Sequence, residues 1–387
     1  MRAVSLILIA LPIALVAGAY ILYPSLLALL SLFRPRRRRL PDPREWPRIS
    51  LTVPSYNEEA SIRATLESLL RLDYPADRRQ IIIISDASTD RTDDIVREFA
   101  DRGVELVRLP ERRGKTAAEN AAGAVVRGDI VINIDATVRL RPDSLKALVR
   151  AFEDPAVGVA SGRDVSVGAS AREAARGESG YVGYEMWVRS LETRLGSIVG
   201  ASGCFYGIRR ALYDPRFPEE LSRDFASALV AREHDLRAVS VDDAVCEVPR
   251  TSSLRSELRR KTRTMARGLE TLWYKRHLMN PARYGGFAFM LIGHKLGRWL
   301  VYPALVGAVV GLVLLAFESR AAAGLLALAV AAIALGAAGM RWPGTRVPMV
   351  LAVPGFILAA NVAGILAWMK VLRRQRSPTW EPTRRPA

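Results

Sequence analysis

Long apolar runs near both ends of the chain separate membrane-like segments from a globular part. Residues 4–33 carry no charged side chain, and three further apolar runs follow at 301–317, 321–340 and 347–369. A helix that crosses a bilayer needs roughly 20 such residues. The first run is too long for the apolar core of a signal peptide, and no small-residue cleavage pattern closes it. We therefore expect a retained membrane anchor.

The block between the first two runs alternates short apolar strands with helical stretches. Isoleucines fill positions 81–84 without a break, which is typical of a parallel strand that is covered on both faces. A first strand from Ile49 is expected to break at Pro54, with Asn57 as the N-cap of the following helix. The repeated alternation predicts an α/β fold built on an open, doubly wound sheet.

Polar residues follow the strands of this block at one predicted edge of the sheet. Ligands of doubly wound sheets bind at the carboxyl ends of the strands. Asp86 and Ser88 alone are compatible with helix capping, but carboxylates at successive strand ends indicate a binding site. The sequence has neither a GxGxxG fingerprint after the first strand nor a complete phosphate-loop pattern. The residues expected at this edge are Ser55 to Glu58, Asp86 to Ser88, Gly114, Lys115 and Asp135 to Thr137.

The net charge of +17 is concentrated beside the apolar runs. Residues 34–48, 250–276 and 370–387 hold excesses of 5, 7 and 5 positive charges, which together account for the whole net charge. The remainder is neutral, which argues against a nucleic-acid-binding groove. Basic segments beside membrane helices are typical of cytoplasmic loops in contact with anionic lipid. Only two cysteines are present, so no disulfide framework is implied and a reducing compartment fits.

The membrane topology has two open solutions. If all four apolar runs cross the membrane, a cytoplasmic globular block leaves the basic C-terminal tail outside, against its charge. Either 347–369, interrupted by prolines, enters and returns on one side, or the stretch GGFAFMLIGHKLGRWL inserts as well. The expected segments are a transmembrane helix (4–33), a basic linker (34–48), a cytoplasmic domain (49–250), a basic amphipathic interfacial segment (251–300), a C-terminal transmembrane region (301–370) and a basic tail (371–387).

Five motifs of the globular block resemble, in order and separation, those of the family 2 glycosyltransferases. These are VPSYNEEASIRATLESLL, IIIISDASTDRTDDIV, GKTAAENAA, GDIVINIDATVRLRPDSLKALV and SGCFYGIRRALYD. The similarity covers about residues 49–270, and membrane helices after a basic segment are shared with the cellulose, chitin and hyaluronan synthase branch. The resemblance implies a GT-A domain that uses a nucleotide sugar, with a UDP-sugar expected first.

The resemblance also implies which residues hold the donor. The loop containing Pro54, Tyr56 and Glu58 would wall the nucleotide base. Asp86 would accept a hydrogen bond from the base, because a fixed acceptor can read a uracil N–H. Lys115 would lie near the diphosphate as a compact positive charge.

The metal site departs from the family pattern. Asp135 matches the first Asp of the family's DxD motif, which holds the ribose and the metal-bound diphosphate, but Thr137 stands in place of the second Asp. We expect Mg²⁺ or Mn²⁺, because such ions often use one or two carboxylates together with phosphate oxygens. Arg139 and Arg141 could carry part of the phosphate charge instead.

A later acid matches the family's catalytic base. Asp224, in an Arg-Asp-Phe segment expected to open a helix, would remove the acceptor's hydroxyl proton, as an inverting transfer requires. A helix-start Asp interacting with the dipole is the simpler interpretation. The neighbouring Glu219 and Glu220 are expected to be solvated. The less favoured candidates for the base are Asp235, Asp242 and Asp243.

Two further segments carry acceptor and pyrophosphate roles in the family. Gly203 and Cys204 lie in a segment similar to the acceptor-lining loop, where Cys204 is expected to act as a packing residue. Arg263 matches the Arg of the QxxRW region that clamps pyrophosphate, but Arg260 replaces its Gln and Thr264 its Trp. The missing Trp argues against polymerisation without arguing against transfer.

Together these features predict an integral membrane glycosyltransferase with a cytoplasmic catalytic domain, in a bacterial inner membrane. It would transfer a hexose or N-acetylhexosamine to a membrane-associated saccharide or lipid. One alternative is a processive polysaccharide synthase, for which about four spans are few. The other is a weakly active or inactive scaffold in a polysaccharide assembly complex, suggested by Thr137.

Overall fold

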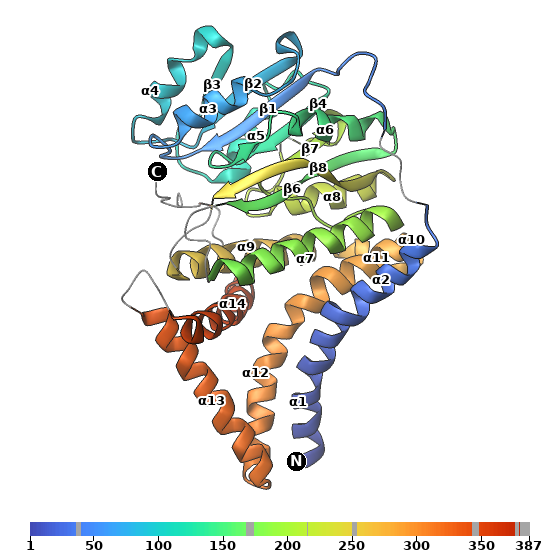
Figure 1. Ribbon diagram of the computed structural model, residues 1–387, viewed down its shortest axis with the longest axis vertical. Coiled ribbons are helices and arrows are strands. Elements are labelled where there is room, and N and C mark those ends of the chain that lie inside the picture. Colours follow the sequence, from blue (N-terminus) through green and yellow to red (C-terminus); the bar gives the residue numbers. More distant parts are fainter. Residues whose placement is uncertain are drawn as a thin grey trace. The chain divides into compact units, whose positions relative to one another are not determined.

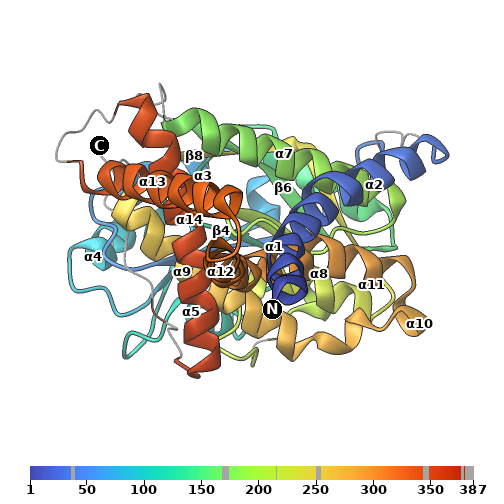
Figure 2. The same ribbon diagram turned by 90° about the horizontal axis from the view of Figure 1, so that it is seen from below.

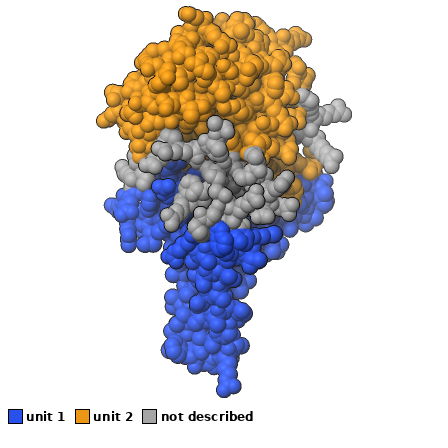
Figure 3. All heavy atoms as spheres, turned by 60° about the vertical axis from the view of Figure 1, so that its left-hand side comes forward, with its two compact units in different colours: residues 1–33, 169–180, 251–376 blue, residues 34–168, 181–250, 377–387 orange. Residues whose placement is uncertain are grey.

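The computed structural model divides the chain into two compact units (Figure 3). We call residues 1–33, 169–180 and 251–376 the helical unit, and residues 34–168, 181–250 and 377–387 the sheet unit. Four arginines of the basic linker and most of the basic tail lie outside the described residues. The structure describes residues 1–35, 40–167, 174–214, 216–249, 254–342, 348–375 and 379, without the side chains of 174–179, 181 and 254–257.

The described part of the sheet unit contains one sheet of eight strands (Figure 1). The strands are β1 Ile49–Ser55, β2 Arg79–Ser85, β3 Val104–Arg108, β4 Ile130–Ile134, β5 Arg139–Leu140, β6 Val157–Val167, β7 Phe205–Arg209 and β8 Arg237–Pro249. Their order is β3-β2-β1-β4-β7-β6-β8-β5. The first four are parallel, as the sequence predicts, but β7 runs antiparallel to β4 and β6. The α/β class is confirmed, and the sheet is mixed.

Helices cover both faces of the sheet, which explains the uninterrupted isoleucines of β2. Ile81 and Ile83 pack with the apolar faces of α3, α4 and α6, whereas Ile82 and Ile84 pack against α5. Successive side chains of a strand point to opposite faces, so both sets must be apolar. The helices are α3 Ile62–Leu70, α4 Thr92–Arg97, α5 Lys115–Ala122, α6 Ser144–Arg150, α7 Ala174–Leu195 and α8 Arg223–Glu233, with short 3₁₀ turns at Ala76–Arg78, Ala100–Arg102, Ala151–Glu153 and Arg210–Leu212.

Two details after β1 differ from the sequence prediction. The strand continues through Pro54, which is tolerated because the pairing of β1 with β4 already ends at Thr52. Asn57 is not an N-cap: α3 begins after Ser61, and Asn57 adopts a left-handed conformation with φ of 51°. Its backbone N–H donates to Ser88 Oγ at 3.2 Å, so the residue fastens one loop to another.

The described part of the helical unit contains four helical stretches that are long and apolar enough to cross a membrane. These are Arg2–Leu32, Gly286–Ala316, Arg320–Arg341 and Met349–Leu372. Within them lie α1 Arg2–Val16, α2 Tyr23–Leu32, α11 Gly286–Leu291, α12 Gly297–Ala316, α13 Arg320–Arg341 and α14 Met349–Leu372, with π-helical turns at Ala17–Leu22 and Ile292–Leu296. The remaining helices of the unit are α9 Leu254–Tyr274, α10 Pro281–Tyr284 and a 3₁₀ turn at Arg276–Met279.

The C-terminal spans differ from those expected. The stretch GGFAFMLIGHKLGRWL is no additional span, because it forms one continuous helix with the apolar run after it, from residue 286 to 316. The last apolar run does not turn back: α14 stays helical through Pro354 and Asn361. The interfacial position of residues 251–300 stays a prediction, and the apolar helical stretch begins within them, at Gly286.

Small residues allow close helix contacts inside the helical unit (Figure 2). A Cβ added at Gly311 of α12 would lie 2.7 Å from the Ser5 carbonyl oxygen of α1. One added at Gly268 of α9 would lie 2.9 Å from the Trp299 ring of α12. Helix α9 also packs through Ala266 against α14, so its apolar face is covered by other helices of its own unit.

Candidate active site

The loop after β1 is tied to the loop after β2. The Thr89 N–H donates to Asn57 Oδ1 at 2.8 Å, and the Glu58 N–H donates to Thr92 Oγ1 at 2.8 Å. The Tyr56 ring lies under the Arg112 guanidinium, whose carbon is 3.9 Å from the ring centroid. Hydrogen bonds with the polar residues after β2 thus hold the loop that carries Tyr56 in place.

Asp86 holds the loop before α5. Its carboxylate is fully buried and accepts the N–H of Arg113 at 2.7 Å through Oδ1 and the N–H of Gly114 at 2.9 Å through Oδ2. It does not cap α4, which begins at Thr92. Because these bonds fix the residues immediately before α5, they also fix Lys115 at its first position.

Lys115 joins two segments that are far apart in the sequence. Its ammonium donates to Asp135 Oδ1 at 2.6 Å and to the Gly203 carbonyl at 2.8 Å. Burial opposes the positive charge, but the carboxylates of Asp135, Glu119 and Asp224 outweigh burial and raise the pKa of Lys115 above its usual value. Lys115 is therefore a charged group held at the carboxyl end of β4.

Asp224 lies against the same glycine. It stands in the first turn of α8, as predicted, and Ser222 Oγ donates to its Oδ1 at 2.5 Å. Its Oδ2 packs so closely on Gly203 that a Cβ there would lie 2.7 Å away. The structure therefore brings Gly203 and Asp224 to Lys115 and Asp135, the pair that the sequence placed at one edge of the sheet.

Sequence reasoning missed a buried ion pair beneath this group. Glu119 lies four residues after Lys115 on α5, with its side chain 2% exposed and Oε1 4.0 Å from the Lys115 ammonium. The Arg223 guanidinium, also buried, is 3.8 Å from the other oxygen of Glu119 and stacks on Tyr213 and Phe217. The signal in the sequence was the i, i+4 spacing of Lys115 and Glu119 on a predicted helix.

The loop that carries Gly203 has its own support. Ser202 Oγ donates to Asp164 Oδ1 at 2.6 Å and accepts the Cys204 N–H at 3.1 Å. Burial raises the pKa of Asp164, while the Ser202 hydrogen bond and the Arg189 charge oppose that rise. Cys204 packs against the main hydrophobic core, as expected of a packing residue.

Several residues that the sequence analysis assigned to the phosphate site or to solvent contact other protein groups. Arg139 Nη1 donates to Thr65 Oγ1 at 2.9 Å, and Arg141 Nε donates to Glu247 at 3.3 Å, so both bind protein groups. Glu219 is not simply solvated, because it pairs with Arg113 at 2.5 Å. Arg263 lies on α9 and belongs to the helical unit.

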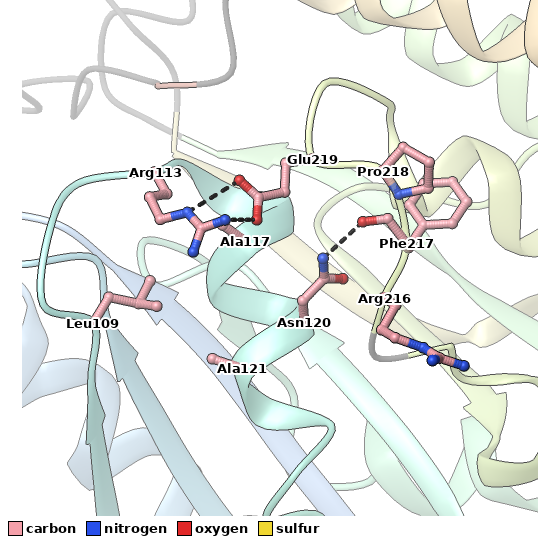
Figure 4. Close-up of a pocket in the computed structure, with 9 residues that line it drawn as sticks. All are labelled: Leu109, Arg113, Ala117, Asn120, Ala121, Arg216, Phe217, Pro218 and Glu219. Atoms are coloured by element: carbon pink, nitrogen blue, oxygen red, sulfur yellow. Dashed lines mark hydrogen bonds and ion pairs between the residues drawn. The ribbon is translucent and has the colours of Figure 1, made fainter.

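A cavity of about 500 Å³ lies on the neighbouring side of α5 (Figure 4). The Arg113 guanidinium points at the Glu219 carboxylate across it, and the Asn120 amide donates to the Phe217 carbonyl at 2.7 Å. Asp135 and Lys115 do not line it. The cavity therefore separates α5 from the segment that leads to α8, and is distinct from the edge of the sheet where Lys115 and Asp135 meet.

The protein oxygens at the carboxyl edge of the sheet suit a hard divalent cation only if oxygens that do not belong to the protein complete its coordination. Among the described residues, no group of three or more His, Cys, Asp or Glu side chains is placed to hold a metal. Asp135 remains 36% exposed, and the Thr137 hydroxyl lies two residues on. One carboxylate with phosphate oxygens and water fits Mg²⁺ or Mn²⁺.

We expect Gly203→Ala to lower kcat by about 10- to 100-fold, because the new Cβ must displace Asp224 or the Lys115 acceptor, and displacements near 1 Å have such costs. Transfer kinetics measure the effect. Gly196→Ala is the matched control, since its added Cβ meets no atom of the described residues within 4 Å. Unchanged kcat in Gly203→Ala would contradict the prediction that Asp224 lies at the reacting centre.

Comparisons with known proteins agree with this geometry. An N-acetylglucosaminyltransferase of Rhizobium sp. (strain N33) is 26% identical over 287 residues, which cover 68% of this chain and 62% of the relative. A beta-monoglucosyldiacylglycerol synthase of Nostoc sp. is 29% identical over 185 residues, covering 47% of this chain and 40% of the relative. The chain thus spans less than two thirds of either relative's length.

A solved structure is similar over nearly the whole chain. This is a mannosyltransferase from Pyrobaculum calidifontis in complex with GDP-Man and Mn²⁺, with 25% identity and a TM-score of 0.73, covering 95% of this chain and 100% of that one. The sequence model of glycosyl transferase family 2 matches residues 50–217, which include β1, β4 and the Gly203 loop. Residues 50–217 thus carry a glycosyl transferase family 2 domain with a GT-A fold.

Proposed function

We propose that this protein is a membrane-embedded inverting glycosyltransferase that moves a sugar from a nucleoside diphosphate sugar to a hydroxyl of a membrane-associated saccharide or lipid. The observation that carries the proposal is the convergence of Lys115, Asp135 and Asp224 around Gly203 at the carboxyl edge of the sheet. The similar mannosyltransferase and the glycolipid and N-acetylglucosaminyl relatives support the reaction class.

The proposed reaction uses Asp224 as the general base. Asp224 takes the proton of the acceptor hydroxyl while that oxygen forms a bond to the anomeric carbon of the donor. The bond from this carbon to the diphosphate oxygen breaks, and the nucleoside diphosphate leaves with the electron pair. Lys115 stabilises the negative charge that develops on the leaving group. Attack opposite the leaving group inverts the anomeric centre.

The donor is proposed to lie along the loop that carries Tyr56. Pro54, Tyr56 and Glu58 would wall the base, and Asp86 would read it in addition to holding the Arg113–Gly114 loop. A bound Mg²⁺ or Mn²⁺ supplies Lewis-acid stabilisation of the diphosphate, and Asp135 with Thr137 would hold it. Arg263 is proposed to contact the pyrophosphate, and Gly203 with Cys204 to line the acceptor.

Thr137→Asp is expected to lower the Mn²⁺ concentration for half-maximal activity by about fivefold or more while transfer persists, because a second carboxylate adds a direct metal ligand. Titration of Mn²⁺ into chelator-treated wild-type and variant protein measures this. An inactive, folded Thr137→Asp would instead reveal a positive role of the threonine hydroxyl.

A single-step transferase is favoured over a processive synthase. The segment that matches QxxRW lacks both its Gln and its Trp, with Arg260 and Thr264 in those positions. The described residues contain four candidate spans, which are few for a polymer-conducting pore. The length distribution of the product distinguishes the two, since a processive enzyme gives long chains early in the reaction.

We propose that the sheet unit faces the cytoplasm of a bacterial cell and that the candidate spans lie in the inner membrane. Basic segments flank the apolar runs, as the positive-inside rule requires of cytoplasmic loops. Labelling of a single cysteine introduced into the linker tests this orientation, because the linker of intact cells is expected to be protected from reagents outside the cell. Labelling of the linker cysteine from outside the cell would reverse it.

A donor panel tests the proposed function as a whole. Purified full-length protein in detergent is incubated with radiolabelled UDP-Glc, UDP-GlcNAc or GDP-Man, with Mn²⁺ and membrane lipids as acceptors. We expect one donor to give a labelled product or slow hydrolysis. No consumption of any donor by folded protein, together with no nucleotide binding, would favour the scaffold alternative.

A further inference from the structure

The group around Lys115 is an alternating chain of buried and half-buried charges. Asp135, Lys115, Glu119 and Arg223 follow one another, at 2.6 Å, 4.0 Å and 3.8 Å. Asp224 acts on the same charges. Two cations therefore face three carboxylates, which leaves one net negative charge at the donor edge.

Lys115 occupies the position where a metal ion at Asp135 is expected. Its ammonium holds Asp135 Oδ1 at 2.6 Å, and both side chains remain about one third exposed. With Thr137 in place of a second carboxylate, no other acidic side chain of that motif competes for the cation. In the donor-free protein, Asp135 is thus already neutralised by a residue of its own chain.

Glu119 is a second carboxylate with which the Lys115 ammonium can pair. Its side chain is 2% exposed, and its Oε1 accepts no hydrogen bond from any residue that the structure describes, although it faces Lys115 at 4.0 Å. A buried carboxylate oxygen without a hydrogen bond is costly. Movement of the ammonium from Asp135 toward Glu119 would satisfy that oxygen and release Asp135.

We propose, building on the proposed function, that Lys115 is a built-in counter-ion that excludes a free divalent cation from Asp135 and yields only to a metal–nucleotide complex, with Glu119 receiving the displaced ammonium. A free divalent cation would make the net charge of the group positive beside Lys115, and a free doubly charged diphosphate would make it more negative. The two together change the net charge by less than either does alone, both for a nucleotide sugar and for UDP or GDP, whose diphosphate carries about one more negative charge. Metal and nucleotide must therefore bind together.

Mn²⁺ binding to the full-length protein in detergent, followed by electron paramagnetic resonance, tests the proposal without any turnover. Wild-type protein is expected to bind Mn²⁺ at least ten times more tightly when UDP or GDP is present. Lys115→Met is expected to bind Mn²⁺ alone at least ten times more tightly than wild type does. Its Mn²⁺ affinities with and without UDP or GDP are expected to differ by less than threefold. Lys146→Met is the control, since Lys146 pairs with surface Asp73 at 2.7 Å and lies over the Trp46 ring, and neither residue belongs to the group around Lys115.

Glu119→Gln tests the receiving carboxylate separately. This isosteric change is expected to leave the binding of Mn²⁺ alone unchanged and to weaken joint Mn²⁺ and nucleotide binding at least fivefold. Thermal unfolding verifies that each variant is folded. If a variant does not fold, the comparison of Mn²⁺ binding to wild-type protein with and without nucleotide still tests whether metal and nucleotide bind together.

Failure of the inference differs from failure of the proposed function. If UDP or GDP binds but Mn²⁺ affinity is the same with and without it, the counter-ion role of Lys115 is wrong and the transferase proposal stands. If neither nucleotide binds to folded wild-type protein, both are overturned. Equal joint binding by Glu119→Gln and wild type overturns the receiving role of Glu119.

Discussion

Asp224→Asn is expected to reduce kcat by about 10²- to 10⁴-fold, the range in which a general base contributes. The amide is nearly isosteric and can still accept from Ser222 and lie against Gly203, but it cannot take the acceptor proton. Nucleotide affinity should change little, because the proposed nucleotide contacts are made by other residues. Steady-state kinetics and calorimetry with UDP or GDP measure the two effects.

Asp235→Asn is the matched control for this change. Asp235 follows the same helix α8, its side chain is 91% exposed, and its φ of 57° is a conformation that Asn adopts readily. It is also a rival candidate for the base, so the control decides between them. A large loss in Asp235→Asn with normal activity in Asp224→Asn would reverse the assignment.

Asp86→Asn is expected to raise the donor KM by about tenfold or more and to destabilise the sheet unit by about 1–3 kcal/mol. Both carboxylate oxygens accept backbone N–H groups, from Arg113 and Gly114, and an amide can replace only one of them. Its NH₂ group would face a donor in a fully buried position. The loop would shift, and Lys115 with it.

Thermal unfolding and donor kinetics together separate the two roles of Asp86. If the residue only reads the base, the donor KM rises while the unfolding temperature stays the same. If it also holds the loop, both change. Asp77→Asn is the control, because the Asp77 side chain is 81% exposed and pairs only loosely with Arg78, at 3.7 Å. Unchanged kinetics and stability in Asp86→Asn would contradict both roles.

Local patterns were sufficient for the buried strand β2 and for the candidate spans. The run of isoleucines in β2 predicts a strand that is buried on both faces, because every position of such a strand needs an apolar side chain. The apolar runs of the helical unit predict helices in lipid for the same reason. Local patterns failed where a loop conformation depends on a distant partner. Asn57 takes a positive φ because Ser88 and Thr89 bind it, and no pattern near Asn57 reports that contact.

The sequence by itself determined the α/β class, the likeness to family 2 glycosyltransferases, the apolar spans and the carboxylates at the strand ends. The tertiary structure decided which of these groups meet. Because β7 inserts antiparallel beside β4, the Asp135 N–H bonds to the Cys204 carbonyl at 3.1 Å, and Gly203 comes to Lys115. Helix α8 then places Asp224 on that glycine and Arg223 on Glu119. Three of these four contacts join residues that lie 69 to 104 positions apart, and only the packed sheet brings such residues together.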